Sequence, residues 1–120
     1  MNPHITLALF HLFLVAPLFF VVGFMRADTP KWVYTLLLIL GVIIFIYHGY
    51  KFILRWRGES SLVWINALHV AIVAPLLIYI GVKQKETLRG GYELLLMTGF
   101  AAFGYHLYSL VKEMQVIDRA

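Results

Sequence analysis

The sequence contains no cysteine, and only 13% of its 120 residues are charged. The absence of cysteine excludes disulfide bridges, thiolate metal sites, iron–sulfur clusters and covalently attached c-type haem. The scarcity of charge is unusual, because about a quarter of the residues in a soluble globular domain are charged. No basic stretch interleaved with aromatic residues lies outside the apolar segments. We therefore expect no nucleic-acid partner.

Apolar residues make up 62% of the chain, and the mean hydropathy is +0.83. A chain this short cannot bury so much apolar surface in one core, so the expected partner is a lipid bilayer. A helix that spans a bilayer needs about 20 largely apolar residues. Four segments meet this requirement, at residues 5–25, 32–54, 62–82 and 92–111. With only short polar connections between them, they predict one all-α, multi-pass membrane domain over residues 1–120.

The charged residues do not indicate how the domain is oriented in the membrane. Lys and Arg divide evenly, five on each side of the four predicted spans, so the positive-inside rule favours neither orientation. Four spans are also few for a sealed site or pathway. We therefore expect a homo-oligomer or a subunit of a larger membrane complex.

The second half of the chain repeats the first at an offset of 58 positions. Residues 11–53 align with 69–111 without gaps and share 16 identities in 43 positions, among them two His, one Pro, two Gly and three Tyr. The two copies, at approximately 5–54 and 62–112, each contain two spans and so enter the membrane from the same side. The sequence predicts a four-helix bundle built as a parallel repeat of a two-helix hairpin.

Four of the five histidines belong to this repeat, where His11 corresponds to His69 and His48 to His106. At a rise of about 1.5 Å per residue, all four lie roughly 8–10 Å inside the same membrane face. Residues shared by the two copies recur three and four positions apart, which marks one stripe on each helix that we expect to face the bundle. Because ionisable residues inside a membrane are candidates for function, we predict one inward layer of four imidazoles.

Two prolines and two glycines accompany this layer. Pro17 and Pro75 fall near the middle of the membrane, where each removes a helical hydrogen bond and predicts a kink in both copies. Gly41 and Gly99 lie two turns from their histidines. They predict close packing of helices at those positions, or space for a bulky group.

Other polar residues close to the histidines are candidates for hydrogen bonds to the rings. Asn66 lies one turn before His69 and is expected to orient that ring, whereas its counterpart in the first copy is Ala8. This difference makes the two copies chemically unequal. The candidate acceptors for imidazole N–H groups are Tyr47, Tyr50, Tyr105 and Tyr108.

The favoured interpretation of the layer is a binding site for a transition metal or a haem, used in metal handling or electron transfer. Neutral imidazole is a common ligand for Zn, Cu and Fe, and three or four converging rings satisfy a usual coordination number. A b-type haem would instead take two axial ligands, either His11 with His69 or His48 with His106. The other two histidines would then have no role in binding it.

Two alternatives stay open. A ring of histidines that titrates near neutral pH could carry protons or ions, although no acidic residue within the spans continues such a relay. The histidines could also only join helices, in a structural subunit of a larger membrane assembly. The sequence offers no set of residues for catalysis, which favours a role other than that of an enzyme.

Overall fold

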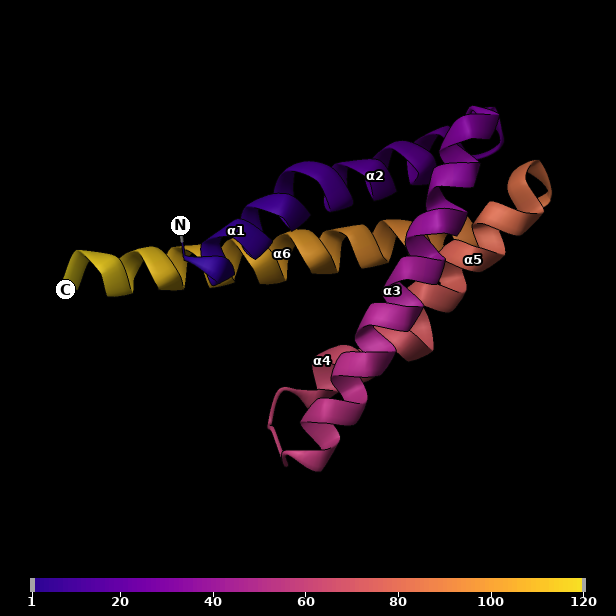
Figure 1. Ribbon diagram of the computed structural model, residues 1–120. Coiled ribbons are helices and arrows are strands. Elements are labelled where there is room, and N and C mark those ends of the chain that lie inside the picture. Colours follow the sequence, from indigo (N-terminus) through magenta and orange to yellow (C-terminus); the bar gives the residue numbers. More distant parts are fainter. Residues whose placement is uncertain (1, 120) are drawn as a thin grey trace. The chain divides into compact units, whose positions relative to one another are not determined.

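The computed structural model describes residues 2–119, and these residues form helices and turns without a β-strand (Figure 1). The described part of the chain contains four helices that are long and apolar enough to cross a membrane. The prediction of an all-helical chain with four such segments is confirmed. The helices cover Pro3–Asp28, Lys31–Arg57, Val63–Glu86 and Arg89–Arg119, and apart from the start of the third helix they extend beyond the predicted limits into the polar flanks.

The second and fourth helices are continuous α-helices. Helix α3 covers Lys31–Arg57 and helix α6 covers Arg89–Arg119. Proline is absent from both, so every backbone N–H within them can serve the helical ladder. Helix α3 begins directly after Pro30, whose fixed φ suits the start of a helix, and it ends at Arg57, with Gly58 as the capping residue.

The first and third helices each contain one wider turn. The first consists of α1 (Pro3–Phe10), a π-helical turn and α2 (Ala16–Met25), with the π-helical turn at His11–Val15. The third has the same order of α4 (Val63–Leu68), a π-helical turn and α5 (Ala74–Lys83), with the π-helical turn at His69–Val73. The two π-helical turns are 58 positions apart, at equivalent places in the two halves.

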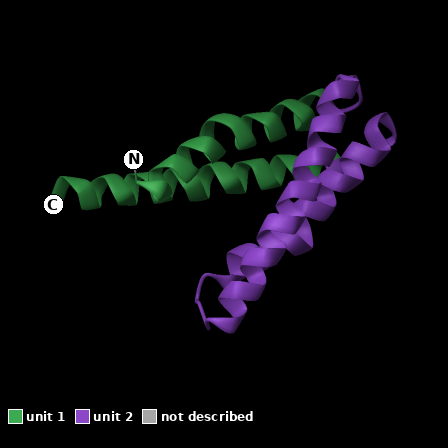
Figure 2. Cartoon of the chain, viewed as in Figure 1, with its two compact units in different colours: residues 1–25, 92–120 green, residues 26–91 purple. Residues whose placement is uncertain are grey.

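The chain forms two compact units that differ from the two sequence repeats (Figure 2). Unit 1 combines residues 1–25 with 92–120, and unit 2 comprises residues 26–91. Each unit therefore pairs a helix that contains a π-helical turn with a continuous helix from the other copy of the repeat. In unit 2, α3 packs along α4, the π-helical turn and α5.

Glycines bring the paired helices into close contact in both units. In unit 2, a Cβ on Gly81 would lie 2.6 Å from Leu38 Cβ and 2.8 Å from Leu38 Cα. In unit 1, a Cβ on Gly23 would lie 2.5 Å from Leu96 Cδ2. Gly81 corresponds to Gly23, and Leu38 corresponds to Leu96, at the offset of 58 positions. A methyl added at either crossing would clash, with backbone atoms of Leu38 at Gly81 and with the Leu96 side chain at Gly23.

The glycines chosen from the sequence lie at a second set of contacts. A Cβ on Gly41 would lie 2.9 Å from Ile78 Cγ1, and one on Gly99 would lie 3.0 Å from Phe20 Cε1. Ile78 and Phe20 are again equivalent at the offset of 58. The nearest atoms here belong to side chains, and the nearest backbone atom, Ile78 N at 3.1 Å from a Cβ on Gly41, is farther away than the Leu38 backbone is from a Cβ on Gly81.

Replacing Gly81 with alanine tests how much the close crossing contributes to stability. The added methyl would meet backbone atoms of Leu38, so the helices must separate, and such overpacking costs about 1–3 kcal/mol. We expect Gly81→Ala to lower the thermal unfolding midpoint, followed by circular dichroism in detergent. Gly49→Ala is the matched control, since a Cβ there meets nothing within 4 Å. Equal midpoints for the two variants would contradict the prediction.

Candidate functional site

The four repeated histidines lie in two stacked pairs, one in each unit. In unit 1 the rings of His11 and His106 have centroids 4.0 Å apart and an interplanar angle of 18°. In unit 2 the rings of His48 and His69 have centroids 4.0 Å apart and an angle of 10°. All four side chains are half-buried. Each pair joins a π-helical turn to a continuous helix.

The prolines explain why a π-helical turn holds one histidine of each pair. Pro17 and Pro75 have no N–H, and in a regular α-helix their rings would press on the carbonyl four residues earlier. A π-helical turn inserts an extra residue before the proline, which relieves this conflict. The N–H of Ala16 accordingly donates to the carbonyl of His11, five residues back. The equivalent bond in unit 2 runs from Ala74 to His69.

A backbone hydrogen bond orients the histidine at the start of each π-helical turn. His11 Nδ1 lies 2.9 Å from the carbonyl oxygen of Leu7, and His69 Nδ1 lies 2.7 Å from that of Ile65. A carbonyl oxygen can only accept, so Nδ1 carries the proton in both rings. In the neutral ring the lone pair is then on Nε2, and Nε2 is the atom able to bind a metal ion or accept a proton.

In unit 2 the other histidine of the pair, His48, is held by the side-chain amide of Asn66, which also contacts Arg55. Arg55 donates from a guanidinium nitrogen to Asn66 Oδ1 at 2.7 Å, and Asn66 Nδ2 lies 2.9 Å from His48 Nδ1. Because the guanidinium can only donate, the amide oxygen must face Arg55 and the amide N–H must face His48. His48 Nδ1 therefore accepts, and the neutral ring carries its proton on Nε2.

The residues that make this polar contact are replaced at the equivalent positions of unit 1. The positions that correspond to Asn66 and Arg55 are Ala8, which is buried, and Glu113. Glu113 instead accepts a hydrogen bond of 3.1 Å from the side-chain amide of Asn2. The two pairs thus have the same ring geometry, but an arginine and an amide accompany one and a carboxylate accompanies the other.

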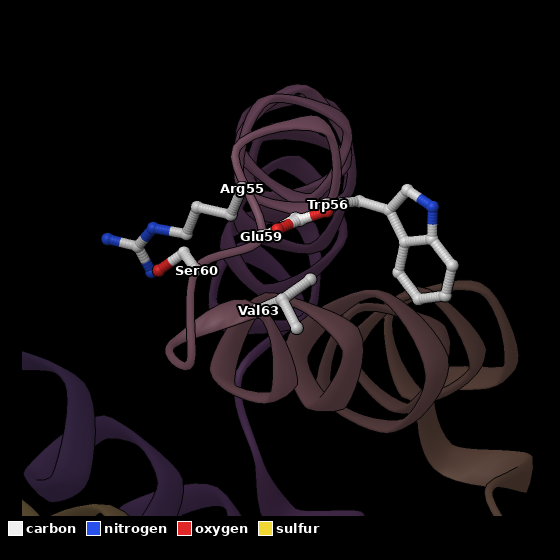
Figure 3. A pocket seen from close by; sticks show the side chains of 5 residues that line it. All are labelled: Arg55, Trp56, Glu59, Ser60 and Val63. Carbon is white, nitrogen blue, oxygen red and sulfur yellow. The ribbon is translucent and has the colours of Figure 1, made fainter.

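Arg55, the outermost residue of this polar contact, lines a shallow pocket in unit 2. The pocket has a volume of about 380 Å³ and lies at the turn between α3 and α4 (Figure 3). Arg55 and Trp56 extend in opposite directions there, with the Glu59 carboxylate between them. Arg55 therefore connects a surface pocket to the buried Asn66. The lining residues are Arg55, Trp56, Glu59, Ser60 and Val63.

The structure brings together some of the predicted site residues and not others. The predicted hydrogen bond from Asn66 goes to His48, on the neighbouring helix, and not to His69. Among residues 2–119, no three His, Asp or Glu side chains gather closely enough to hold a metal ion. The predicted layer of four histidines would need both pairs, and it stays a prediction.

The four tyrosines proposed as hydrogen-bond acceptors have exposed side chains. Tyr47 and Tyr105 contact the rings of His48 and His106, which follow them in the chain, edge to face at centroid distances of 5.2 Å. Tyr50 and Tyr108 are among the most exposed aromatic residues of the described chain.

Sequence reasoning did not assign Arg55 to the site. The sequence does contain a sign of this contact, because the other copy has Glu113 in place of Arg55 and Ala8 in place of Asn66. Two positions that differ together between otherwise similar copies are candidates for contact.

The chain matches no protein-family model, no curated protein and no solved structure.

The proton positions assigned to the two rings of unit 2 can be measured by ¹⁵N-histidine NMR in lipid nanodiscs. We expect His48 to carry its proton on Nε2 and His69 on Nδ1. An Asn66→Asp change puts an acceptor beside His48 Nδ1, so it should move the proton of that ring to Nδ1 and leave His69 unchanged. A wild-type His48 ring protonated at Nδ1 would contradict the assignment.

Proposed function

We propose that this chain is a small integral membrane protein that crosses the bilayer four times and binds a transition metal ion through stacked histidines. Its architecture would be a four-helix bundle derived from two parallel copies of a helical hairpin. The 58-residue offset that relates the glycine contacts, the π-helical turns and the ring stacks supports this origin.

The surface of the helices supports the membrane part of the proposal. Phe13, Ile46 and Met97 are 71%, 66% and 66% exposed, and many other large apolar side chains along the helices are exposed as well. Removing one such side chain from water is worth about 1.5–3 kcal/mol. Trp32, Trp56 and Trp64 lie near helix ends, as is typical at a membrane interface. Lipid is therefore the favoured surrounding.

Extraction from membranes tests this part. We expect the protein to stay in the membrane pellet after washing with alkaline carbonate and to dissolve only in detergent, because four apolar helices anchor it. A peripheral protein, held by its basic residues alone, would be released by carbonate or by high salt. Release under either condition would contradict the proposed topology.

The observation that carries the metal proposal is the anchoring of His11 and His69 through Nδ1. Histidines that bind metals almost always donate their other ring N–H to a carboxylate, a backbone carbonyl or water, which fixes the ring and directs Nε2 to the ion. This arrangement occurs in both units. Each anchored ring also has a second imidazole stacked on it.

The spacing of the stacked rings favours an ion bound beside them over a haem between them. With metal–nitrogen bonds of about 2.0 Å and ring centroids about 1.1 Å beyond the nitrogens, two rings on one tetrahedral ion have centroids roughly 5 Å apart. The 4.0 Å between the centroids of each stacked pair is nearer to this value than to haem ligation, although the near-parallel rings must tilt before both Nε2 atoms can face one ion. Axial ligands on opposite sides of a haem iron would hold their ring centroids roughly 6 Å apart, given the same bond length. Zn, Cu or Fe is therefore preferred to haem b.

One pair supplies two ligands, so a four-coordinate ion needs two more. Water or a pair from elsewhere, including a second copy of the chain, could complete the set. A homo-oligomer is consistent with this requirement.

Elemental analysis of the gently purified protein tests the proposal. We expect at least one transition metal ion per chain or per dimer, lost in the double variant His11→Ala/His69→Ala because both anchored ligands are gone. His4→Ala is the matched control, as His4 lies outside the repeat and should leave the metal content unchanged. An absorption spectrum on the same sample separates the alternatives. Protein without metal would refute the proposal, and a Soret band would favour haem.

A second candidate function, proton or ion conduction, is supported by the ring pair of unit 2. There the neutral His48 ring has a donor at Nε2 and the neutral His69 ring an acceptor at Nε2. Flux into proteoliposomes that disappears with His48→Ala, in protein without bound metal, would favour it. A structural subunit would show neither metal nor flux, and its assembly would survive removal of all four rings.

A further inference from the structure

We infer that the pocket at the turn between α3 and α4 binds the phosphoethanolamine headgroup of a phospholipid, with an acyl chain along the adjoining apolar face of α3. The inference relies on the membrane part of the proposed function and is independent of metal binding. All the residues that carry it belong to unit 2. A phosphoethanolamine group has a phosphate and an ammonium side by side, and the pocket offers a partner to each.

The first step concerns the phosphate. Arg55 is half-buried, and one guanidinium nitrogen donates to the buried amide of Asn66 at 2.7 Å, which holds the planar group in place. A guanidinium has five N–H groups, so donors remain for a second acceptor, and their fork matches the oxygens of a phosphate. Ser60 adds a hydroxyl donor. Its Oγ accepts from the backbone N–H of Leu62 at 3.2 Å, and its own proton can turn to the ligand.

The second step concerns the ammonium. The Glu59 carboxylate lies in the same pocket, between Arg55 and Trp56 (Figure 3). A carboxylate repels a ligand that is only anionic, and it pairs with an ammonium next to the phosphate. The indole of Trp56 is 67% exposed, and its face attracts the same cation. A choline ammonium has no N–H to donate to Glu59, so ethanolamine is the preferred group.

The third step is that the turn holds these groups in place before a ligand arrives. The N–H of Gly58 donates to the carbonyl of Leu54 at 3.0 Å, and that of Ser60 donates to the carbonyl of Arg55 at 2.9 Å. Glu59 has a φ of 53°, which few residues with a side chain adopt. Such a conformation persists only where the surrounding structure fixes it, and it is frequent at ligand sites.

The fourth step identifies the ligand as a lipid. A second, apolar pocket of about 200 Å³ adjoins the first, because Trp56 lines both. Phe52 and Ile53 line it, and the rings of Phe52 and Trp56 have centroids 5.8 Å apart. Phe52 lies one turn, about 6 Å, nearer the middle of α3, which is the direction of the membrane interior in the proposed topology. An acyl chain leaving the headgroup would follow this direction.

The other copy of the repeat provides an internal comparison. The positions equivalent to Arg55 and Glu59 hold Glu113 and Ile117. A glutamate repels a phosphate, and an isoleucine cannot pair with an ammonium. We therefore expect one such lipid per chain.

Native mass spectrometry of the full chain in detergent, titrated with dioleoyl-phosphatidylethanolamine, tests the inference. We expect one bound lipid per chain, and weaker binding of phosphatidylcholine and phosphatidylglycerol with the same acyl chains. Arg55→Gln should weaken binding about 10-fold, the value of one hydrogen bond to a charged group. Glu59→Gln, at an exposed position, should weaken it about 3–5-fold. Lys112→Gln is the matched control, since it removes an exposed cation outside the pocket and should bind like the wild type.

A reversal of lipid preference gives a result that misfolding cannot produce. Glu59→Lys replaces the partner of the ammonium with a second cation, so this variant should bind phosphatidylglycerol more tightly than phosphatidylethanolamine. Soluble glycerophosphoethanolamine and inorganic phosphate should not displace the lipid at equal concentration, because they lack acyl chains. Displacement by either would overturn the assignment of a lipid.

The outcomes distinguish this inference from the proposed function. Equal affinity of the wild type for the three lipids, or an unchanged preference in Glu59→Lys, would overturn the inference and leave the proposed topology and metal binding intact. Release of the protein from membranes by alkaline carbonate would overturn the topology and the inference together.

Discussion

A proline in the middle of an apolar helix cannot donate a backbone hydrogen bond, and the rest of this site depends on that constraint. The helix responds before Pro17 and Pro75 with one wider turn, and a histidine lies at the start of each such turn. The histidine ring donates to the carbonyl of the preceding turn, which settles which nitrogen keeps the proton. Backbone geometry thus determines the chemistry of a side chain without any other polar residue.

The two units show how one backbone arrangement can support two chemical states. Ring spacing, π-helical turn and glycine contact recur in both, whereas the polar residues around the rings do not. In unit 2 the guanidinium of Arg55 fixes the amide of Asn66, and the amide fixes His48. In unit 1 the same positions hold Ala8 and Glu113, which cannot form that series of bonds. The difference between the pairs therefore begins at Arg55, which is two hydrogen bonds away from the His48 ring.

Much of the fold was predictable because the length of a long apolar segment is directly visible in a sequence. The four long apolar helices belong to this part, whereas the stacking of the histidines in two pairs was not predicted. The choice of helix partners was not predictable. The period of a helix indicates which stripe is shared, and it carries no information on which neighbour that stripe contacts. Close crossings such as Gly81 against Leu38 make that choice, and they depend on three-dimensional fit.

The same reasoning explains why Asn66 contacts His48 and not His69, the partner that the sequence suggests. Asn66 is one turn from His69 in the chain, and proximity along a helix suggests a contact between them. His69 Nδ1, however, is already satisfied by the carbonyl of Ile65, so the amide turns to the neighbouring helix and meets His48. In an apolar interior a polar group must find a partner, and local backbone acceptors are the first ones available. The polar residues that remain then link one helix to the next, and Asn66 is such a residue.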